Sequence, residues 1–334
     1  MRTALSRFAT TIVLGALMTA AVPTQAATPD LFTKKKVSFK NSTFQMSGEL
    51  YLPAGYEKLG KLPAIVVAHP AGAVKEQAPA SYARGLAAKG LVVLTYDASH
   101  QGESGGEPRC VEYPADRIED IRCAVDYLTT LPFVDSSRIG AMGICAGGGY
   151  SIAAATTDRR IKAVAGVSAT DAGTAMRDGW LGGTPVAEQL KLLEMASAQR
   201  TAEANGQPVA YGPYVPNAPD KNLPNTMQEA YVYYRTPRAQ HPNSVNKVTL
   251  TTFNPLFNFA ATDRIDTLLT QPMLLVVGSK SDARRFTDLF HEKAASKDKA
   301  LVVIDGATHV DLYDQPKYVD PATARLAAFF AAKL

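Results

Sequence analysis

The stretch Gly143-Ile144-Cys145-Ala146-Gly147 is a G-x-nucleophile-x-G pentapeptide in which cysteine stands where serine is usual. The apolar run over residues 139–144 predicts a buried strand, and the small residues 148–155 predict the start of a helix. A strand, a sharp turn and a helix are the context in which this pattern presents a nucleophile. The turn needs glycines because it is strained and its two elements approach closely. A thiol there also lies at a helix N-terminus, where the dipole favours the thiolate. The alternative is an ordinary buried cysteine in a glycine-rich turn.

The composition is that of a globular protein. The chain has 334 residues, of which 46% are hydrophobic and 20% are charged. This length suits one large α/β domain with an insertion. The net charge is +4 and the longest basic block is the three lysines at 34–36, so nucleic-acid binding has no support.

Residues 1–26 have the features of a signal peptide. Arg2 and Arg7 form a basic region, residues 8–21 are apolar, and Thr24-Gln25-Ala26 offers small residues at the positions that a signal peptidase reads. We expect cleavage after Ala26 and export to the periplasm or the medium. The apolar stretch is short for a membrane span, so no stable membrane anchor is expected after processing. An uncleaved anchor is the alternative.

Apolar strands alternate with helical segments along the rest of the chain. Such strands predict a mostly parallel sheet, here of eight strands, with helices on both faces and the chemistry at the carboxyl ends of the strands. The expected strands are two short ones within 37–52, then 62–68, 91–96, 139–144, 161–167, 273–277 and 301–304. The expected helices are 81–89, 115–129, one from about 283, and 321–334.

Residues 171–265 interrupt this alternation. They contain the only tryptophan, Trp180, together with five tyrosines and a Pro/Asn-rich segment at 213–224. We expect a cap or lid that is inserted after the sixth strand and supplies aromatic walls to a pocket, with residues 27–170 and 266–334 as the core. A surface insertion without function is the alternative.

Three longer strings carry a family resemblance. They are residues 69–77 (HPAGAVKEQ), 96–106 (YDASHQGESGG) and 143–150 (GICAGGGY). With the order of strands, they resemble the α/β-hydrolase fold over nearly the whole mature chain. The cysteine at the turn is similar to that of dienelactone hydrolases. The strings are similar to a bacterial subgroup of hydrolases that is related to fungal polyketide acyltransferases.

A cysteine nucleophile needs a base, and the base needs a group that orients it. Of the five histidines, His309 follows the last strand, where the α/β-hydrolase fold places its catalytic histidine. Asp282 follows the penultimate strand and could accept the Nδ1–H of His309. It could instead cap the helix that starts near residue 283. The order nucleophile, acid, histidine fits a Cys145-His309-Asp282 triad.

An oxyanion formed at the substrate needs two donors. The resemblance implies the backbone N–H of Ala146, and Ala71 is the first residue after His69-Pro70 that can donate, because proline has no N–H. The expected pocket residues are His69, Glu76, Tyr150 and Trp180. In dienelactone hydrolases a glutamate near the cysteine modulates its activation, which makes Glu76 a candidate, with a surface ion pair as the alternative.

Three cysteines leave an odd number. If Cys145 is the nucleophile, Cys110 and Cys123 remain and could form a disulfide in an oxidising compartment, or Cys123 could be a packed helix residue. No metal site is expected, because the histidines are scattered and no close Cys/His pair occurs. No cofactor is expected either.

These features predict an enzyme that acts on a small-molecule acyl substrate. Cys145 would attack a lactone, ester or thioester and form a thioester acyl-enzyme that water releases. An acyltransferase of the polyketide-transferase type would use the same cysteine. A thiol protein that senses or binds without turnover is the third alternative.

Overall fold

The computed structural model describes residues 31–41 and 43–334, and the chain from Leu31 onward forms one compact unit. The expected signal peptide, residues 1–26, lies outside the described residues. Within those ranges no helix combines the length and the apolar character that a membrane span requires.

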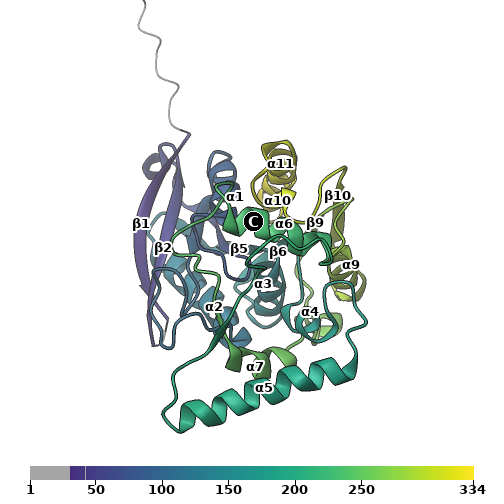
Figure 1. Ribbon diagram of the computed structural model, residues 1–334. Coiled ribbons are helices and arrows are strands. Elements are labelled where there is room, and N and C mark those ends of the chain that lie inside the picture. The colour runs from purple at the N-terminus through teal and green to yellow at the C-terminus, as the bar shows by residue number, and fades with distance from the viewer. Residues whose placement is uncertain (1–30, 42) are drawn as a thin grey trace, which may run out of the picture. The chain divides into compact units, whose positions relative to one another are not determined.

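An eight-stranded sheet runs through this unit in the order β1-β2-β4-β3-β5-β6-β9-β10 (Figure 1). The strands from β4 to β10 in this order are parallel to one another, whereas β1 and β2 pair antiparallel. The sequence predicted this mostly parallel sheet, and the structure confirms it. The strands are β1 (Phe32–Lys40), β2 (Gln45–Pro53), β3 (Leu62–Ala68), β4 (Val92–Tyr96), β5 (Val134–Ile144), β6 (Ile161–Val167), β9 (Met273–Gly278) and β10 (Lys299–Ile304).

Helices cover both faces of the sheet. On one face α1 packs against α11, and on the other α2 packs against α3, which in turn contacts α8. The strands β4 and β9, each of which has a neighbouring strand on both sides, are buried at every residue, while β10 at the sheet edge is only partly covered. The helices of the core are α1 (Ala78–Ala87), α2 (Pro114–Thr130), α3 (Ala146–Thr157), α9 (Arg284–Lys293), α10 (Asp311–Asp314) and α11 (Pro316–Lys333), with one 3₁₀ turn, η1 (Tyr56–Lys58).

Several boundaries differ from those expected. The closing helix was expected to start at Pro321, but α11 starts at Pro316 and contains Pro321. Proline suits the first turn of a helix, where N–H groups have no intrahelical partner, and Pro316 takes that place. Pro321 leaves only the carbonyl of Lys317, one turn earlier, without its helical donor. The strand before Cys145 also begins earlier than expected, at Val134.

The segment between β6 and β9 is largely helical. Its helix α5 packs against α7 and η2, and Figure 1 shows it running beside α7. The elements are α4 (Ala172–Asp178), α5 (Val186–Ala204), β7 (Tyr211–Gly212), α6 (Asn225–Arg235), β8 (Val248–Thr249), η2 (Leu250–Thr252), α7 (Phe253–Phe257) and α8 (Ile265–Leu268).

Candidate active site

Cys145 occupies a strained turn between β5 and α3. Its backbone has φ 54° and ψ −124°, a conformation that few residues other than glycine adopt. Three backbone hydrogen bonds hold the turn: Cys145 N–H donates to Val167 O (3.0 Å), and Cys145 O accepts from the N–H of Gly148 (2.9 Å) and of Thr170 (3.0 Å). These hydrogen bonds thus hold Cys145 in its strained conformation at the carboxyl edge of the sheet.

Two glycines make this turn sterically feasible. A Cβ on Gly143 would lie 2.1 Å from the carbonyl carbon of Gly147. A Cβ on Gly147 would lie 2.4 Å from Ala68 O, on the neighbouring strand β3. Real Cβ atoms do not come this close to backbone, so both positions of the pentapeptide require glycine.

The Cys145 thiol is buried, with a residue exposure of 6%. Burial raises its pKa, while hydrogen bonds with Tyr313 and Thr170 and the N–H of Ala146 act in the opposite direction. The sequence suggested that the helix N-terminus would favour the thiolate. The structure differs, because desolvation of the charge outweighs these donors and the resting group is a thiol.

His309 lies in the loop after β10 and is 1% exposed. Burial lowers its pKa to about 4, although the charge of Asp282 acts in the opposite direction. Its Nε2 is 3.2 Å from the hydroxyl of Tyr313, and its ring meets the Trp180 indole edge-on, with the centroids 5.7 Å apart. Its Nδ1 has no hydrogen-bond partner among the described residues. His309 is therefore a neutral imidazole in contact with Tyr313.

Tyr313, on α10, connects the two groups. Its hydroxyl is hydrogen-bonded to the Cys145 thiol and also lies against His309 Nε2. Burial raises the pKa of Tyr313 well above its usual range, so the phenol keeps its proton. Cys145 and His309, which the sequence singled out, therefore both contact the hydroxyl of Tyr313. The sequence analysis did not single out Tyr313.

Asp282 follows β9 and is close enough to His309 for its charge to act on the imidazole. Its carboxylate, however, accepts hydrogen bonds from the backbone N–H of Thr226 (3.0 Å) and from the Thr226 hydroxyl. Thr226 belongs to α6. The alternative role of Asp282, as the N-cap of the helix that follows it, is not found. Helix α9 begins at Arg284, and Ala283 takes the cap position.

A cavity of about 140 Å³ opens at Cys145. Most of its wall is apolar, and it takes residues from both the core and the segment between β6 and β9. Ala71, Ala146 and Trp180, which the sequence predicted for the oxyanion site and the pocket, all line it. The other lining residues are Glu112, Cys145, Thr170, Ala172, Ala175, Met176, Tyr214, Val215, Thr226, Met227, Ala230, Tyr234, Leu256, Val310 and Tyr313.

Three expected pocket residues lie outside that wall. His69 is fully buried, and both ring nitrogens are used by backbone: Nε2 accepts from Ala98 N–H (3.0 Å) and Nδ1 lies 2.7 Å from Pro70 O. Burial lowers the pKa of His69, so it is a neutral support for the loop that carries Ala71. Tyr150 is buried on α3 against Phe259. Glu76 takes part in an ion pair.

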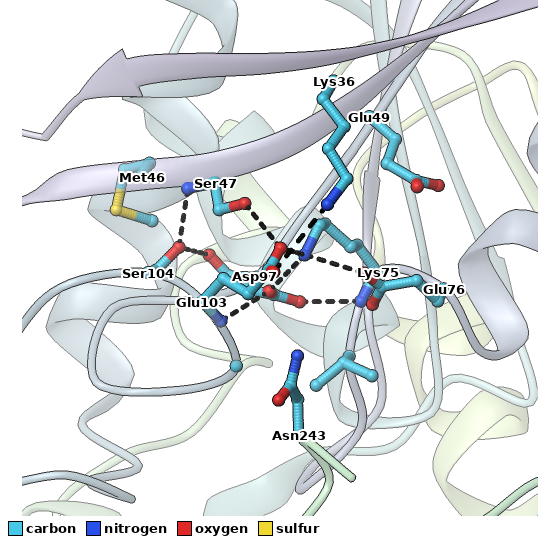
Figure 2. A network of polar contacts seen from close by, with 12 residues as sticks. Lys36, Met46, Ser47, Glu49, Lys75, Glu76, Asp97, Glu103, Ser104 and Asn243 are labelled. Atoms are coloured by element: carbon cyan, nitrogen blue, oxygen red, sulfur yellow. Dashed lines mark hydrogen bonds and ion pairs between the residues drawn. The ribbon is translucent and has the colours of Figure 1, made fainter. Parts of the chain in front are cut away.

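That ion pair belongs to a buried network around Lys75 (Figure 2). The Lys75 ammonium is 0% exposed and lies 2.7 Å from Asp97 Oδ2, 2.7 Å from Glu103 Oε2 and 2.9 Å from Glu76 Oε1. Its backbone N–H also donates to Asp97 Oδ1 (2.8 Å). The network joins the loop after β3, which carries Ala71, to the loop after β4.

Of the two alternatives for Cys110 and Cys123, the disulfide is not formed. The structure does not join Cys110 to Cys123. Cys123 is buried on α2 with its sulfur 3.9 Å from Glu119 Oε1, which matches the alternative of a packed helix residue. Cys110 lies in the preceding loop with φ 63° and donates its N–H to His100 O.

Sequence reasoning missed Glu112 and Tyr313. Both are buried and line the cavity with Cys145. Tyr313 lies on the short helix α10, which follows the loop of His309, and no sequence pattern marks it. Glu112 has no such signal either, because it lies in an irregular loop between β4 and α2. Across residues 31–41 and 43–334, no cluster of three or more His, Cys, Asp or Glu side chains could hold a metal ion.

Comparison with known proteins places the chain in a family. Residues 43–310 match the family described as X-Pro dipeptidyl-peptidase (S15 family). The chain is 43% identical over 303 residues to the uncharacterized protein YcjY of Escherichia coli K12, covering 90% of this chain and 99% of that one. The crystal structure of PA2218 from Pseudomonas aeruginosa superposes with a TM-score of 0.85 at 35% identity, over 91% of this chain and 94% of that one.

Relatives with described activities are more distant. The polyketide transferase GrgF of a Penicillium species is 32% identical over 141 residues, 42% of this chain and 44% of GrgF. Its crystal structure has a TM-score of 0.75 at 21% identity over 90% of this chain and 99% of that one. A dienelactone hydrolase of Anabaena variabilis shares the fold, with a TM-score of 0.54 at 15% identity over 91% of this chain and 99% of that one.

These matches confirm the resemblance that the sequence predicted, to α/β hydrolases that include dienelactone hydrolase and a fungal polyketide transferase. A protein described as an acyltransferase and one described as a hydrolase both occur among the similar proteins. The protein has the α/β-hydrolase fold and belongs to the X-Pro dipeptidyl-peptidase (S15) family.

Proposed function

We propose that this protein is a hydrolase of activated acyl compounds, namely lactones, esters or thioesters, with Cys145 as nucleophile. The observation that carries the proposal is the Cys145 thiol at a strained strand-to-helix turn, on the wall of an apolar cavity, with Tyr313 between it and the neutral base His309. A buried thiol that serves only for packing would need neither the strain nor the base.

The proposed reaction begins with proton transfer. The thiol proton passes to the Tyr313 oxygen while the Tyr313 proton passes to His309 Nε2, so that the phenol is unchanged at the end. The Cys145 sulfur then forms a bond to the acyl carbon, and the N–H groups of Ala146 and Ala71 stabilise the negative charge on the carbonyl oxygen. Collapse breaks the bond to the leaving group, which takes the proton back from His309 through Tyr313.

The second half releases the acyl group. Water attacks the thioester on Cys145 and gives its proton to His309, and the acid product leaves as the sulfur regains a proton. Asp282 is the acid of the proposed triad. The relay needs His309 to carry its hydrogen on Nδ1, and a carboxylate is the natural acceptor for that hydrogen. Asp282 would supply it by turning from Thr226 toward the imidazole.

The proposed substrate class follows from the chemistry of the Cys145 thiol and from the apolar wall of the cavity. A thiolate is a better leaving group than an alkoxide, so the tetrahedral adduct of a plain alkyl ester or amide returns to starting material more readily than it goes forward. Lactones, aryl or enol esters and thioesters have better leaving groups or strained rings. The apolar wall of the cavity favours an acyl portion that is largely hydrocarbon.

Acyl transfer is the second candidate. The similarity to GrgF, which is described as a polyketide transferase, favours it. The acyl-enzyme is the same, and an alcohol or amine takes the place of water in the second half. A thiol protein that binds without turnover would share Cys145 but would form no acyl-enzyme.

Intact-protein mass spectrometry tests the proposal. The reduced protein is mixed with lactones, aryl esters and acyl thioesters, with Cys145→Ala as the control. We expect one acyl mass on the parent protein and none on Cys145→Ala. Decay of the adduct in water supports the hydrolase, and faster decay with product formation when alcohols or amines are added supports the transferase. If Cys145→Ser matches the parent on every activated donor, the thiol has no role and the proposal is wrong.

The same assay tests the relay. Tyr313→Phe removes the hydroxyl between Cys145 and His309 and keeps the ring. We expect the rate of acylation to fall by about 10²-fold, the usual contribution of a positioned proton-transfer group, while the adduct remains on Cys145. An unchanged rate would mean that the thiol and the imidazole exchange the proton directly.

A further inference from the structure

No hydrogen bond joins Asp282 to His309, the acid and the base of the proposed triad. Both carboxylate oxygens of Asp282 are used by Thr226: Oδ2 accepts from its backbone N–H (3.0 Å) and Oδ1 from its hydroxyl. The Nδ1 of His309 is buried and has no hydrogen-bond partner among the described residues. A buried ring nitrogen without a partner is unfavourable, so the group that could satisfy it is held elsewhere.

Thr226 holds this carboxylate from the first turn of α6. Backbone N–H groups in a first turn have no intrahelical partner, and the helix dipole there favours a negative charge. Thr226 is buried, so its N–H would be left unpaired if Asp282 turned away. The resting arrangement is therefore favourable at Thr226 and unfavourable at His309, and a change in the position of α6 alters the balance between the two.

Two other carboxylates approach the loop that carries His309, and both bind its backbone. Glu229, also on α6, accepts from the N–H of Val310 (3.5 Å). Asp311, at the start of α10, accepts from the N–H of Thr308 (3.1 Å). These two side chains hold the loop on either side of the imidazole and leave its Nδ1 without an acceptor. The acid of the proposed triad is therefore the partner that this nitrogen lacks.

Helix α6 is also a wall of the cavity beside Cys145, to which it contributes Thr226, Met227, Ala230 and Tyr234. Within the described part of the chain, α6 has no extended packing against another helix or strand. The cavity measures about 140 Å³, whereas ligand pockets usually measure roughly 300–1,000 Å³. An acyl chain of several carbons therefore requires a wall to move, and α6 is the wall that also holds the acid.

We propose that Thr226 is a positioning residue that holds Asp282 away from His309 at rest and releases it when an acyl chain displaces α6. This inference rests on the proposed function, because it assigns both residues to the reaction and the acyl chain to the cavity. A bound chain can shift the balance only if it binds the released arrangement more tightly, and a longer chain has more apolar surface with which to do so. The enzyme thus selects acyl chains of several carbons over an acetyl group.

Replacement of Thr226 tests the hold without any substrate. Thr226→Val removes the hydroxyl and keeps the shape, and Thr226→Ser is the matched control that keeps the hydroxyl. NMR titration of the imidazole signals, with His309→Gln to assign them, measures the pKa of His309. We expect Thr226→Val to raise this pKa by at least about one pH unit, because the freed carboxylate approaches the ring, and Thr226→Ser to match the parent. An unchanged pKa in Thr226→Val, or an equal rise in both variants, overturns the hold.

The release can be measured in the parent protein, so it does not depend on whether a variant folds. Octanamide and acetamide carry no activated acyl group, and the titration is repeated with each of them at a concentration that calorimetry shows to be saturating. We expect octanamide to raise the pKa of His309, whereas further burial of the ring by a ligand would by itself lower it. Acetamide should leave the pKa unchanged. Octanamide that does not bind, or that binds without raising the pKa, overturns the release.

Rates of acylation at saturating donor connect the hold to the reaction. In the parent protein we expect an octanoyl thioester to acylate Cys145 roughly 10-fold faster than an acetyl thioester, because binding of the remote chain contributes to positioning the acid. In Thr226→Val the acetyl donor should gain and the difference should fall to less than about threefold. Equal rates for the two donors in the parent protein would contradict the proposal. If the mass assay shows no acylation at all, the proposed function fails, while the two titrations still decide the role of Thr226.

Discussion

At the residue scale, burial keeps both reactive groups uncharged at rest. It raises the pKa of the Cys145 thiol and lowers that of the His309 imidazole to about 4. The resting state is therefore a thiol beside a neutral base, and the charges develop only when the proton moves. Tyr313 suits this arrangement, because a phenol that does not ionise can pass a proton while staying neutral.

The protonation of His309 can be observed directly. Trp180 is the only tryptophan, its ring contacts His309, and a protonated imidazole quenches indole fluorescence. We expect a fluorescence titration with a midpoint near pH 4, and kcat/KM that stays level down to about pH 5 and falls below it, since the neutral base is the active form. His309→Gln should lack the fluorescence transition. A transition near pH 6.5 that depends on His309 would contradict the lowered pKa.

At the element scale, one strand and one helix create the strained turn that holds Cys145. β5 enters the turn and α3 leaves it. A methyl group fits neither at Gly143, where β5 approaches α3, nor at Gly147, where α3 approaches β3. The strain at Cys145 is held by hydrogen bonds to β6 and to the loop that follows it. The turn is thus a property of packed elements rather than of the pentapeptide alone.

Gly143→Ala tests this packing. The added Cβ would lie 2.1 Å from backbone that cannot move without displacing α3, so we expect a loss of more than about 3 kcal/mol in the free energy of unfolding. Gly212→Ala is the matched control, because its Cβ would meet only a leucine side chain at 3.3 Å. Its effect should stay within about 1 kcal/mol. Urea unfolding measures both, and similar values for the two variants would refute the argument.

At the scale of the whole molecule, the buried network around Lys75 connects the loops that follow β3 and β4, at the carboxyl ends of these parallel strands (Figure 2). Asp97, at the end of β4, is fully buried and takes two hydrogen bonds from Lys75. Burial raises the pKa of Asp97 and the ammonium of Lys75 acts in the opposite direction. The network therefore holds the loop of Ala71 at the cost of two buried charges, which are stable only as a pair.

Lys75→Met should be strongly destabilising. It leaves the Asp97 carboxylate buried without its cation, and breaking such a pair costs about 3–5 kcal/mol. Lys36→Met is the matched control, since Lys36 is 76% exposed at the side chain and lies 3.9 Å from the same Glu103. Exposed pairs contribute about 0–1 kcal/mol, so that variant should unfold almost like the parent. If both variants lose the same stability in urea, the Lys75 network is not a buried pair in the folded protein.

Much of this protein was determined by its sequence alone. Apolar runs alternating with helical segments predicted the parallel sheet, because buried strands between two helical layers must be apolar on both faces. The glycines around Cys145 predicted the strand-to-helix turn that holds this cysteine, and the position of His309 after the last strand predicted a histidine at the same edge of the sheet. These signals are local, and the physical requirement behind each of them lies within a few residues of chain.

Only the tertiary structure decided which residues of the site contact one another. Glu112, Thr226 and Tyr313 come from three different loops or helices, and only packing brings them to one cavity with Cys145. The backbone N–H of Thr226 donates a hydrogen bond to the carboxylate of Asp282, and Tyr313 lies between the Cys145 thiol and the His309 imidazole. The protonation states of Cys145 and His309 also could not be predicted from the sequence. They depend on desolvation, which is set by every element that covers the site.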